Sequence, residues 1–335
     1  MKLGLVFECK GKKIPIWYFL FLLVVWIFWA TYMYSTHSFH LYTKHAYEVL
    51  TMVFGSFIAG SSPEGSAAIA YPIFTLLLKI DPAEARNFAF AIQSIGMTSA
   101  SLLILGLAIK VEWNYIRYVA IGGLLGLLIG NYWVVPLISP PLAKLFFVSL
   151  WLGFGVVLWK ENRSSRAVFN SLSSVSSSDI LRLLFFGLVG GIISSIFGTG
   201  INIFTFCLMT IYYGIDEKVA IPSSVIIMTI ETIAGFFLHA AVIGDFQTNV
   251  FEMWIVCMPV VVVFAPLGAF VISKVPRKSV ATFLYCILIV QFLGAMWVIK
   301  PGLNQMMLSL SVLISGILIF LYLSKLRKKQ LVSET

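Results

Sequence analysis

Charged residues are scarce in this sequence. Only 11% of the 335 residues are Asp, Glu, Lys or Arg, whereas 60% are hydrophobic and the mean hydropathy is +0.97. A soluble domain carries about 25% charged residues, so this chain could not cover its surface with polar groups in water. Apolar runs of about 20 residues, the length that crosses a bilayer, recur along the chain. The sequence therefore predicts an integral membrane protein whose main surroundings are the lipid bilayer.

Cysteine and histidine are also scarce. The four cysteines (Cys9, Cys207, Cys257 and Cys286) show no metal-ligand spacing, and the four histidines are scattered. The chain has no His-Glu-x-x-His, paired-aspartate or Gly-x-Ser-x-Gly motif. We therefore expect free thiols, no metal, no cofactor and no enzymatic activity.

Acidic residues are outnumbered, with 14 Asp and Glu against 23 Lys and Arg and a net charge of +9. In a soluble protein this excess would suggest nucleic-acid binding. Here the basic residues lie between apolar runs, where they report membrane topology instead. We expect no nucleic-acid partner.

Two mostly apolar regions, 47–79 and 180–213, are interrupted in the middle by Gly, Pro and polar residues. Each half has about 14 residues, or roughly 21 Å of helix, which is short of the ~30 Å hydrocarbon core. We therefore predict two re-entrant hairpins. The predicted full spans lie near residues 14–34, 84–109, 116–137, 141–159, 219–243, 251–272, 279–299 and 304–324.

The two interrupted regions align with each other without a gap. The segment Gly55 to Gly65 aligns with Gly190 to Gly200, and Asp81 aligns with Asp216 at the same offset. This alignment indicates an internal duplication. If both regions are hairpins, 18 of the 23 Lys and Arg residues lie on the side of the termini, which predicts cytoplasmic N- and C-termini. The hairpins then enter from opposite sides, so the repeats are inverted.

These features divide the chain into five segments. An N-terminal span and outer loop (1–46) precede the first repeat (47–159), a Ser-rich cytoplasmic linker (160–179), the second repeat (180–299), and a last span with a basic tail (300–335). The predicted fold class is an all-α membrane protein, an inverted-repeat transporter with two re-entrant hairpins and about eight full transmembrane helices. Its predicted location is the plasma membrane.

The hairpin interruptions are the predicted binding site. Backbone that leaves helical geometry inside a bilayer must be buried in protein or line a wet cavity. Inverted-repeat transporters aim the N-termini of half-helices at an anion there. The alternative is a glycine-rich hairpin that packs dry against its neighbours. The predicted substrate-binding residues at the two tips are Ser62, Glu64, Gly65, Thr199, Gly200 and Asn202.

The span after each hairpin carries polar residues at helical spacing. Gln93 lies about ten residues into its helix, or roughly 15 Å deep, where polar side chains tend to face an interior or a cavity. The alternatives are an interhelical hydrogen bond for Gln93, snorkelling for Arg86 and a polar contact near the outer helix end for His239. The predicted substrate-binding residues of these spans are Arg86, Asn87, Gln93, Ser94, Ser223, Ser224 and Thr229.

Two carboxylates, Glu64 and Glu231, lie in apolar surroundings. Either could pair with a cation, form a structural hydrogen bond as the neutral acid, or carry a proton for coupling. An ionised Glu64 would oppose a bound anion, so its protonation would couple anion and proton movement. Separately, the Gly122-xxx-Gly126-xxx-Gly130 face predicts close helix packing, either inside the monomer or in a homodimer.

The second repeat contains a Gly-rich hairpin from Gly187 to Asn202, then Gly214-Ile-Asp-Glu-Lys-Val-Ala220, then the small polar pair Ser223–Ser224. This pattern resembles the signature of the TauE/SafE family, the toluene-sulfonate uptake permeases. The resemblance covers residues 47–299, although the first repeat has fewer glycines. It implies a permease that moves small sulfur-containing anions, such as sulfite or organosulfonates, by alternating access. An anion or small-solute channel on the same inverted repeat is the alternative.

Overall fold

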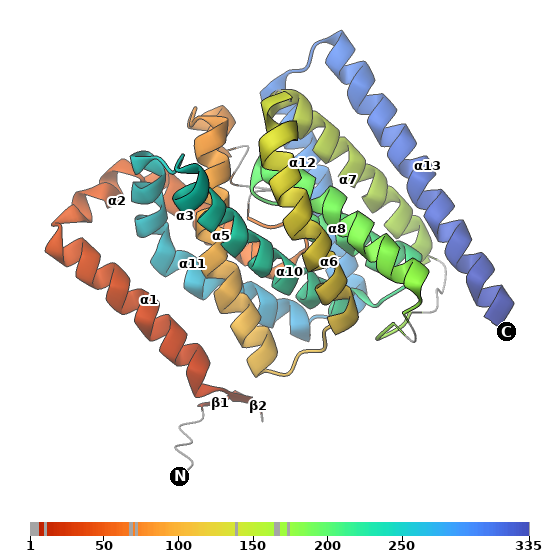
Figure 1. Cartoon of the computed structure of the whole chain (residues 1–335), viewed down its shortest axis with the longest axis horizontal. Helices are drawn as coiled ribbons and strands as arrows, with labels where there is room; N and C mark the ends of the chain where they lie inside the picture. Colours follow the sequence, from red (N-terminus) through yellow and green to blue (C-terminus); the bar gives the residue numbers. More distant parts are fainter. Residues whose placement is uncertain are drawn as a thin grey trace.

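Each long apolar run of the sequence folds as a helix (Figure 1). The computed structural model describes residues 7–334 except 10–11, 67–69, 71–72, 138–139, 164–167 and 173–174. In chain order the described elements are β1 (Phe7–Cys9), β2 (Lys12–Ile14), α1 (Ile16–Ser35), η1 (Ser38–His40), α2 (Leu41–Lys44), α3 (Ala46–Ser61), η2 (Ile73–Leu77), α5 (Pro82–Gly106), α6 (Trp113–Ile129), η3 (Gly130–Val134), η4 (Val135–Leu137), α7 (Pro140–Arg163), α8 (Ser177–Phe197), α9 (Ile201–Cys207), η5 (Leu208–Tyr212), α10 (Glu217–Phe237), η6 (Leu238–Ile243), α11 (Thr248–Lys274), α12 (Arg277–Ile299) and α13 (Leu303–Glu334).

Nine helices within these described residues are long and apolar enough to cross a membrane. Eight of them correspond to the predicted spans, which confirms an all-α membrane protein. The first span begins two residues later than expected, because Ile14 pairs with Phe7 in a short antiparallel β-ladder. Pro15 follows in extended conformation, and α1 begins after it.

The ninth helix is α8, the first arm of the second predicted hairpin. It has 21 residues and is itself long and apolar enough to cross a membrane, so the prediction of arms of about 14 residues, too short to span the bilayer, was wrong for this helix. Ser176 and Asp179 form a capping box that starts the helix before the apolar run, with each side chain accepting a hydrogen bond from the other residue's N–H, at 3.3 and 3.1 Å. The helix ends where predicted, because Gly198 and Gly200 adopt φ angles of +73° and +145°.

The first hairpin is interrupted at the predicted place as well. Helix α3 ends at Ser61, and Gly65 follows with a φ angle of +75°. The predicted half-helix after Gly65 falls largely on residues 67–69 and 71–72, which lie outside the described part of the chain. Among the described residues of this half-helix, the N–H of Ala70 donates a hydrogen bond to the carbonyl of Ser66 at 2.8 Å, which is the spacing of an α-helix.

Helix starts recur at aligned positions of the two repeats. Asp81 caps α5 by accepting a hydrogen bond from the N–H of Ala83 at 2.8 Å. Asp216 caps α10 in the same way, with the N–H of Lys218 also at 2.8 Å. An aspartate at this position satisfies a helix N–H that has no partner inside the helix.

The segments before these caps recur as well. Each contains a π-helical turn, η2 in the first repeat and η5 in the second, and the turns begin at the aligned residues Ile73 and Leu208. Each segment then passes through a left-handed residue, Lys79 with φ +55° and Gly214 with φ +66°. The aligned segments therefore share local backbone geometry that their side chains do not dictate.

The first arm of each hairpin packs on a helix from the other half of the sequence. Helix α3 packs on α11, where a side chain on Gly60 would overlap the carbonyl of Ala265 and one on Gly268 would overlap that of Phe57. Gly60 therefore permits close contact between the two helices.

The glycine face of α6 packs on α8 in the same chain. Side chains on Gly122 and Gly126 would overlap the carbonyls of Leu184 and Leu188, and one on Gly130 would overlap Ser195. Small residues allow such close approach. The predicted Gly-xxx-Gly face is thus occupied inside the monomer, so it offers no support for a homodimer.

A proline helps to join α11 to α5. Pro266 has no N–H to donate to the carbonyl of Val262, one turn earlier in α11. The hydroxyl of Ser99 in α5 donates to that carbonyl at 2.7 Å instead. The break in helical bonding is satisfied by a neighbouring helix, as membrane helices require.

The Ser-rich linker is partly held against the helices. The N–H of Phe169 donates to the carbonyl of Gly214 at 2.9 Å, and the N–H of Leu172 donates to the Glu112 carboxylate at 3.0 Å. The described part of the linker is therefore anchored, although its composition suggested a flexible segment.

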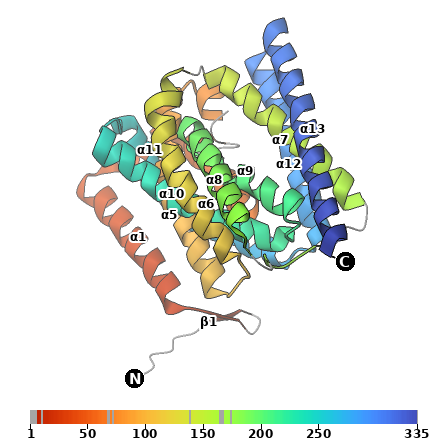
Figure 2. The same cartoon turned by 45° about the vertical axis from the view of Figure 1, so that its right-hand side comes forward.

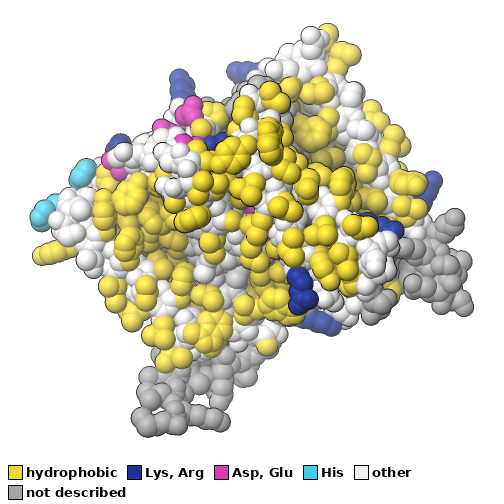
Figure 3. Space-filling model, viewed as in Figure 1, with side chains coloured by type: hydrophobic (Ala, Val, Ile, Leu, Met, Phe, Trp, Pro, Cys, Tyr) yellow, Lys and Arg dark blue, Asp and Glu magenta, His cyan; other side chains and the backbone are white. Residues whose placement is uncertain are grey.

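Helices α1 and α13 flank the bundle on opposite sides, and the N-terminal end of α1 and the C-terminal end of α13 point the same way (Figures 1 and 2). Hydrophobic side chains cover most of the visible face, and most of the visible charged ones lie toward its borders (Figure 3). This surface matches a protein surrounded by lipid.

Candidate functional site

The two helix interruptions, predicted to be hairpin tips, meet inside the bundle. A Cβ atom on Gly65, at the first tip, would lie 2.5 Å from Oγ1 of Thr199 at the second tip and 3.0 Å from Oε1 of Gln93 in α5. No side chain fits in that space, so the approach requires glycine at position 65. The structure thus brings three predicted site residues together from two hairpins and a span.

Gln93 fixes the second tip to α5. Its Nε2 donates hydrogen bonds to the carbonyls of Ala89 at 2.9 Å and Gly198 at 3.1 Å. Its Oε1 lies close to Gly65, is buried, and has no hydrogen-bond partner among the described residues. The interhelical hydrogen bond considered for Gln93 is present, and it leaves one buried acceptor facing the junction of the tips.

Met228 of α10 occupies the position in the second repeat that aligns with Gln93. Its sulfur accepts a hydrogen bond from Nδ2 of Asn202 at 2.9 Å, and its methyl carbon would lie 3.1 Å from a Cβ on Gly65. The sequence analysis did not single out Met228. Its alignment with Gln93 was the signal that could have found it.

The junction is closed to solvent. The exposed fractions of the side chains around it are 0% for Glu64, 2% for Gln93, 2% for Thr199 and 1% for Asn202.

Glu64 lies beside the junction and faces two other helices. The hydroxyl of Ser62 accepts a hydrogen bond from the Glu64 N–H at 3.3 Å and donates to the carbonyl of Ile58 at 2.9 Å, which shapes the turn. Lys144 of α7 and Gln291 of α12 lie near the Glu64 carboxylate, but neither carboxylate oxygen has a hydrogen-bond partner among the described residues.

Lys144 lies in the second turn of α7 and is only 3% exposed. It is the only basic residue in the apolar run 141–159, and an ionisable residue in such a run is a functional candidate. That signal was available in the sequence.

Glu231 lies at a different place, between α10, α6 and α8. Its Oε2 would be 2.8 Å from a Cβ on Gly123 of α6, and its carboxylate lies near Ser194 of α8. The Ser194 hydroxyl accepts a hydrogen bond from the N–H of Ile201, the first residue of α9, at 2.9 Å. Glu231 is 2% exposed, and neither of its oxygens has a hydrogen-bond partner among the described residues.

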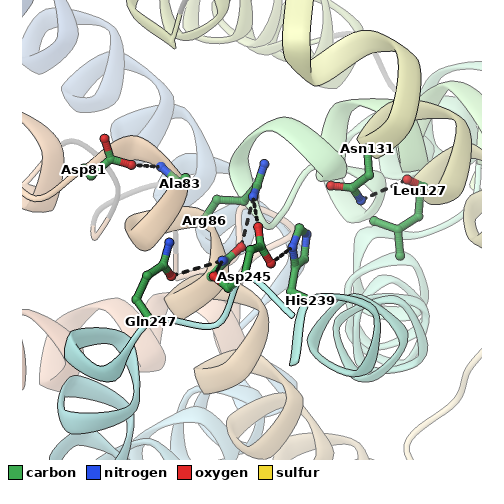
Figure 4. A network of polar contacts seen from close by, with 9 residues as sticks. Asp81, Ala83, Arg86, Leu127, Asn131, His239, Asp245 and Gln247 are labelled. Carbon is green, nitrogen blue, oxygen red and sulfur yellow. Dashed lines mark hydrogen bonds and ion pairs between the residues drawn. The ribbon is translucent and has the colours of Figure 1, made fainter. Parts of the chain in front are cut away.

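Arg86 and Asn87 belong to a separate cluster around Asp245 (Figure 4). The Arg86 guanidinium contacts the Asp245 carboxylate at 3.2 Å, and Asn87 Nδ2 donates to the Asp245 carbonyl at 2.9 Å. His239 contacts the same carboxylate at 2.8 Å, the polar contact considered for it. The positive charge of Arg86 is therefore paired within the protein.

The hydroxyl groups of the remaining predicted site residues form hydrogen bonds with other groups of the protein. Ser94 and Ser224 donate to carbonyls of their own helices, Ser223 also accepts a hydrogen bond from the N–H of Glu112, and Thr229 bonds Ser101 at 2.7 Å. Their polarity is explained by helix packing. Gly200 allows the chain to turn after α8, because its φ angle of +145° is one that residues with a side chain rarely adopt.

The family model described as Sulfite exporter TauE/SafE matches residues 47–295. This range contains both hairpins and every predicted site residue. The chain belongs to this family. TauE/SafE proteins are membrane transporters, so this TauE/SafE chain is a multi-pass membrane transporter and not an enzyme. No curated protein and no solved structure matches the chain.

Proposed function

We propose that this protein carries small sulfur-containing anions, sulfite or organosulfonates, across the cell membrane by alternating access. The anion would bind between the two hairpin tips. The contact of Gly65 with Thr199 beside Gln93 carries this proposal, because it unites both hairpins at one sealed point. The family description supports the choice of a sulfur anion.

The tips contain hydrogen-bond donors that would bond an anion more strongly than they bond their present acceptors. Nδ2 of Asn202 now donates to the Met228 sulfur, and thioether sulfur is a weak acceptor. The Ser66 hydroxyl is buried without a hydrogen-bond partner among the described residues. Charged oxygens form stronger hydrogen bonds than neutral acceptors, so an anion entering between separated tips would replace these contacts favourably.

Alternating access would follow from two inverted halves that rock against each other. In this arrangement the first hairpin enters from the outer side and the second from the cytoplasmic side, with both termini in the cytoplasm. The recurrence of caps and turns at aligned positions supports the duplication on which this arrangement depends. Glu64 and Glu231 are the candidates for proton coupling.

The test is flux of labelled sulfite and a panel of organosulfonates into proteoliposomes under an imposed pH gradient. We expect saturable flux that falls by about tenfold or more in Gln93→Ala and in Asn202→Ala, since each loses a buried hydrogen bond at the tips. Asn304→Ala removes an exposed amide outside the matched region and should leave flux unchanged.

Absence of sulfur-anion flux from folded protein would overturn the substrate assignment. A channel predicts flux that does not saturate and shows no counterflow, whereas a carrier exchanges labelled for unlabelled anion. The sealed junction favours the carrier.

A further inference from the structure

Two surface pockets adjoin along the contact between α7 and α12. The first has a volume of about 210 Å³ and lies where α7 ends and α12 begins. The second has a volume of about 290 Å³ and lies further along the same two helices. Trp159 and Tyr285 line both pockets, so together they form one groove, the α7–α12 groove.

The first pocket is basic. Arg163 of α7 and Lys278 of α12 line it, and Asn162 and Thr282 add an amide and a hydroxyl group. No carboxylate lies among the described residues that line this pocket. Within the described part of the chain, neither Arg163 nor Lys278 forms an ion pair. Two cations from different helices therefore share one small polar pocket, which suits an anionic group.

The guanidinium of Arg163 stacks on an aromatic ring. Its central carbon lies 3.9 Å from the centroid of Trp159, which is one helical turn earlier in α7. Cation–π stacking uses the face of the guanidinium, whereas its N–H donors point outward along the edge. That edge matches the oxygens of a phosphate group, which guanidinium binds bidentately.

The second pocket is apolar. Gly155 and Val156 of α7 line one wall, and Leu288 and Ile289 of α12 line the other. A Cβ on Gly155 would lie 2.8 Å from Cδ1 of Leu288, so glycine lets the two helices approach closely at the floor of the groove. Val156 and Ile289 are 43% and 49% exposed, so the groove opens on the lipid-facing surface.

We propose that the α7–α12 groove binds one anionic phospholipid. Its phosphate lies between Arg163 and Lys278, and one acyl chain lies along the apolar pocket. From Arg163 to Leu152 the groove follows α7 for roughly 16 Å, about half of the ~30 Å hydrocarbon core, which suits a chain of one leaflet. The predicted topology places the basic pocket in the cytoplasmic leaflet, where anionic lipids attract basic residues. The groove shares no lining residue with the hairpin tips, so the inference does not depend on the transported anion.

The groove is linked to a third helix. Nδ2 of Asn162 donates hydrogen bonds to the hydroxyl of Tyr285 at 2.9 Å and to the carboxylate of Glu217 at 3.2 Å. Glu217 is the first residue of α10 and is fully buried. A lipid that holds α7 and α12 together therefore also supports the start of α10. A ligand that binds only the folded protein raises its unfolding temperature, so thermal unfolding reports this binding.

The experiment measures thermal unfolding of the full-length protein in detergent. Phosphatidylglycerol or phosphatidylcholine with identical acyl chains is added in increasing amounts, and glycerol 3-phosphate tests the headgroup alone. The double variant Arg163→Gln/Lys278→Gln removes both cations. The control Lys110→Gln/Arg117→Gln removes the same charge at exposed residues that are also predicted to be cytoplasmic but line neither pocket.

We expect phosphatidylglycerol to raise the unfolding temperature of the wild type more than phosphatidylcholine does, and to do so saturably. Arg163→Gln/Lys278→Gln should weaken the apparent affinity for phosphatidylglycerol by about tenfold or more, since it loses two charged contacts with the lipid. The control variant should keep the affinity of the wild type. Glycerol 3-phosphate should give no comparable shift, because it lacks the acyl chains.

A second measurement locates the lipid without relying on the charge variants. Acyl chains that carry bromine quench the fluorescence of tryptophans that they contact. At equal mole fraction in phosphatidylcholine vesicles, brominated phosphatidylglycerol should quench the wild type more than brominated phosphatidylcholine does. This difference should disappear in Trp159→Phe and persist in Trp113→Phe, which changes an exposed tryptophan outside the groove.

Equal stabilisation by the two lipids would overturn the inference, and so would an undiminished preference for phosphatidylglycerol in Arg163→Gln/Lys278→Gln. An equal shift with glycerol 3-phosphate would assign the basic pocket to a soluble anion instead. A quenching difference that persists in Trp159→Phe would place the lipid elsewhere on the protein. All these results concern lipid binding alone and leave the proposed transport function standing.

Discussion

At the scale of single residues, the two tips are built from equivalent positions with different side chains. Gln93 aligns with Met228, and Glu64 aligns with Thr199, in the gap-free alignment of the two repeats. The polar amide and the carboxylate come from one half, and the hydroxyl and the thioether come from the other. The aligned positions at the two tips therefore carry different chemical groups.

A second pair of equivalent residues differs in backbone strain. Gly214 and Lys79 both adopt left-handed conformations, which cost a non-glycine residue about 1–2 kcal/mol. We expect Gly214→Ala to destabilise the protein by about 1 kcal/mol and Lys79→Gly to stabilise it slightly. Thermal unfolding of the purified protein in detergent measures both effects.

Gly294→Ala is the control for this pair. Gly294 lies in helix α12, and a Cβ added there would meet nothing within 4 Å. Alanine favours helix by up to about 1 kcal/mol, so this change should be neutral or stabilising. Equal unfolding temperatures for Gly214→Ala and the wild type would show that position 214 tolerates a side chain.

At the scale of elements, the contact between α5 and α11 depends on a hydroxyl. The Ser99 hydroxyl bonds the Val262 carbonyl that Pro266 leaves without a helical donor. Ser99→Ala should leave this carbonyl unpaired in the core and lower the free energy of unfolding by about 1–3 kcal/mol. Denaturation in detergent, followed by tryptophan fluorescence, measures the loss.

Ser315→Ala is the matched change, because Ser315 is a serine of α13 whose hydroxyl bonds carbonyls of its own helix. It should shift the denaturation midpoint by much less. A comparable loss in both variants would mean that the Ser99 bond adds nothing specific to the α5–α11 contact.

The helices themselves could be predicted from hydropathy, because lipid requires long apolar runs with satisfied backbone. The length of α8 could not be predicted in this way. Its first residues, Ser177, Ser178 and Asp179, are polar. They are helical because the capping box between Ser176 and Asp179 starts the helix before them. Local hydrogen bonding, rather than hydropathy, sets that boundary.

At the scale of the whole molecule, the proposed topology can be tested by labelling. Gly302→Cys and Lys110→Cys would place thiols at exposed positions predicted to lie on opposite sides of the membrane. In intact cells, with Cys9 and Cys286 replaced, a membrane-impermeant maleimide should label Gly302→Cys only. Lys110→Cys should react only after permeabilisation.

The reverse pattern would place both termini outside. Labelling of both positions in intact cells would contradict the full crossings between them. Either result would remove the basis for placing the first hairpin on the outer side and the second on the cytoplasmic side.

The membrane-embedded helical fold and the places of both interruptions could be predicted from the sequence, and the duplication stays a prediction. Each depends on features close together in the chain: apolar runs, glycines and capping aspartates. The partners of the buried polar groups were decided only by the tertiary structure. Arg86 is bound by Asp245, and the Ser99 hydroxyl bonds the Val262 carbonyl, because segments distant in sequence pack side by side. Buried charges need partners, but hydropathy and spacing do not say which helix supplies them.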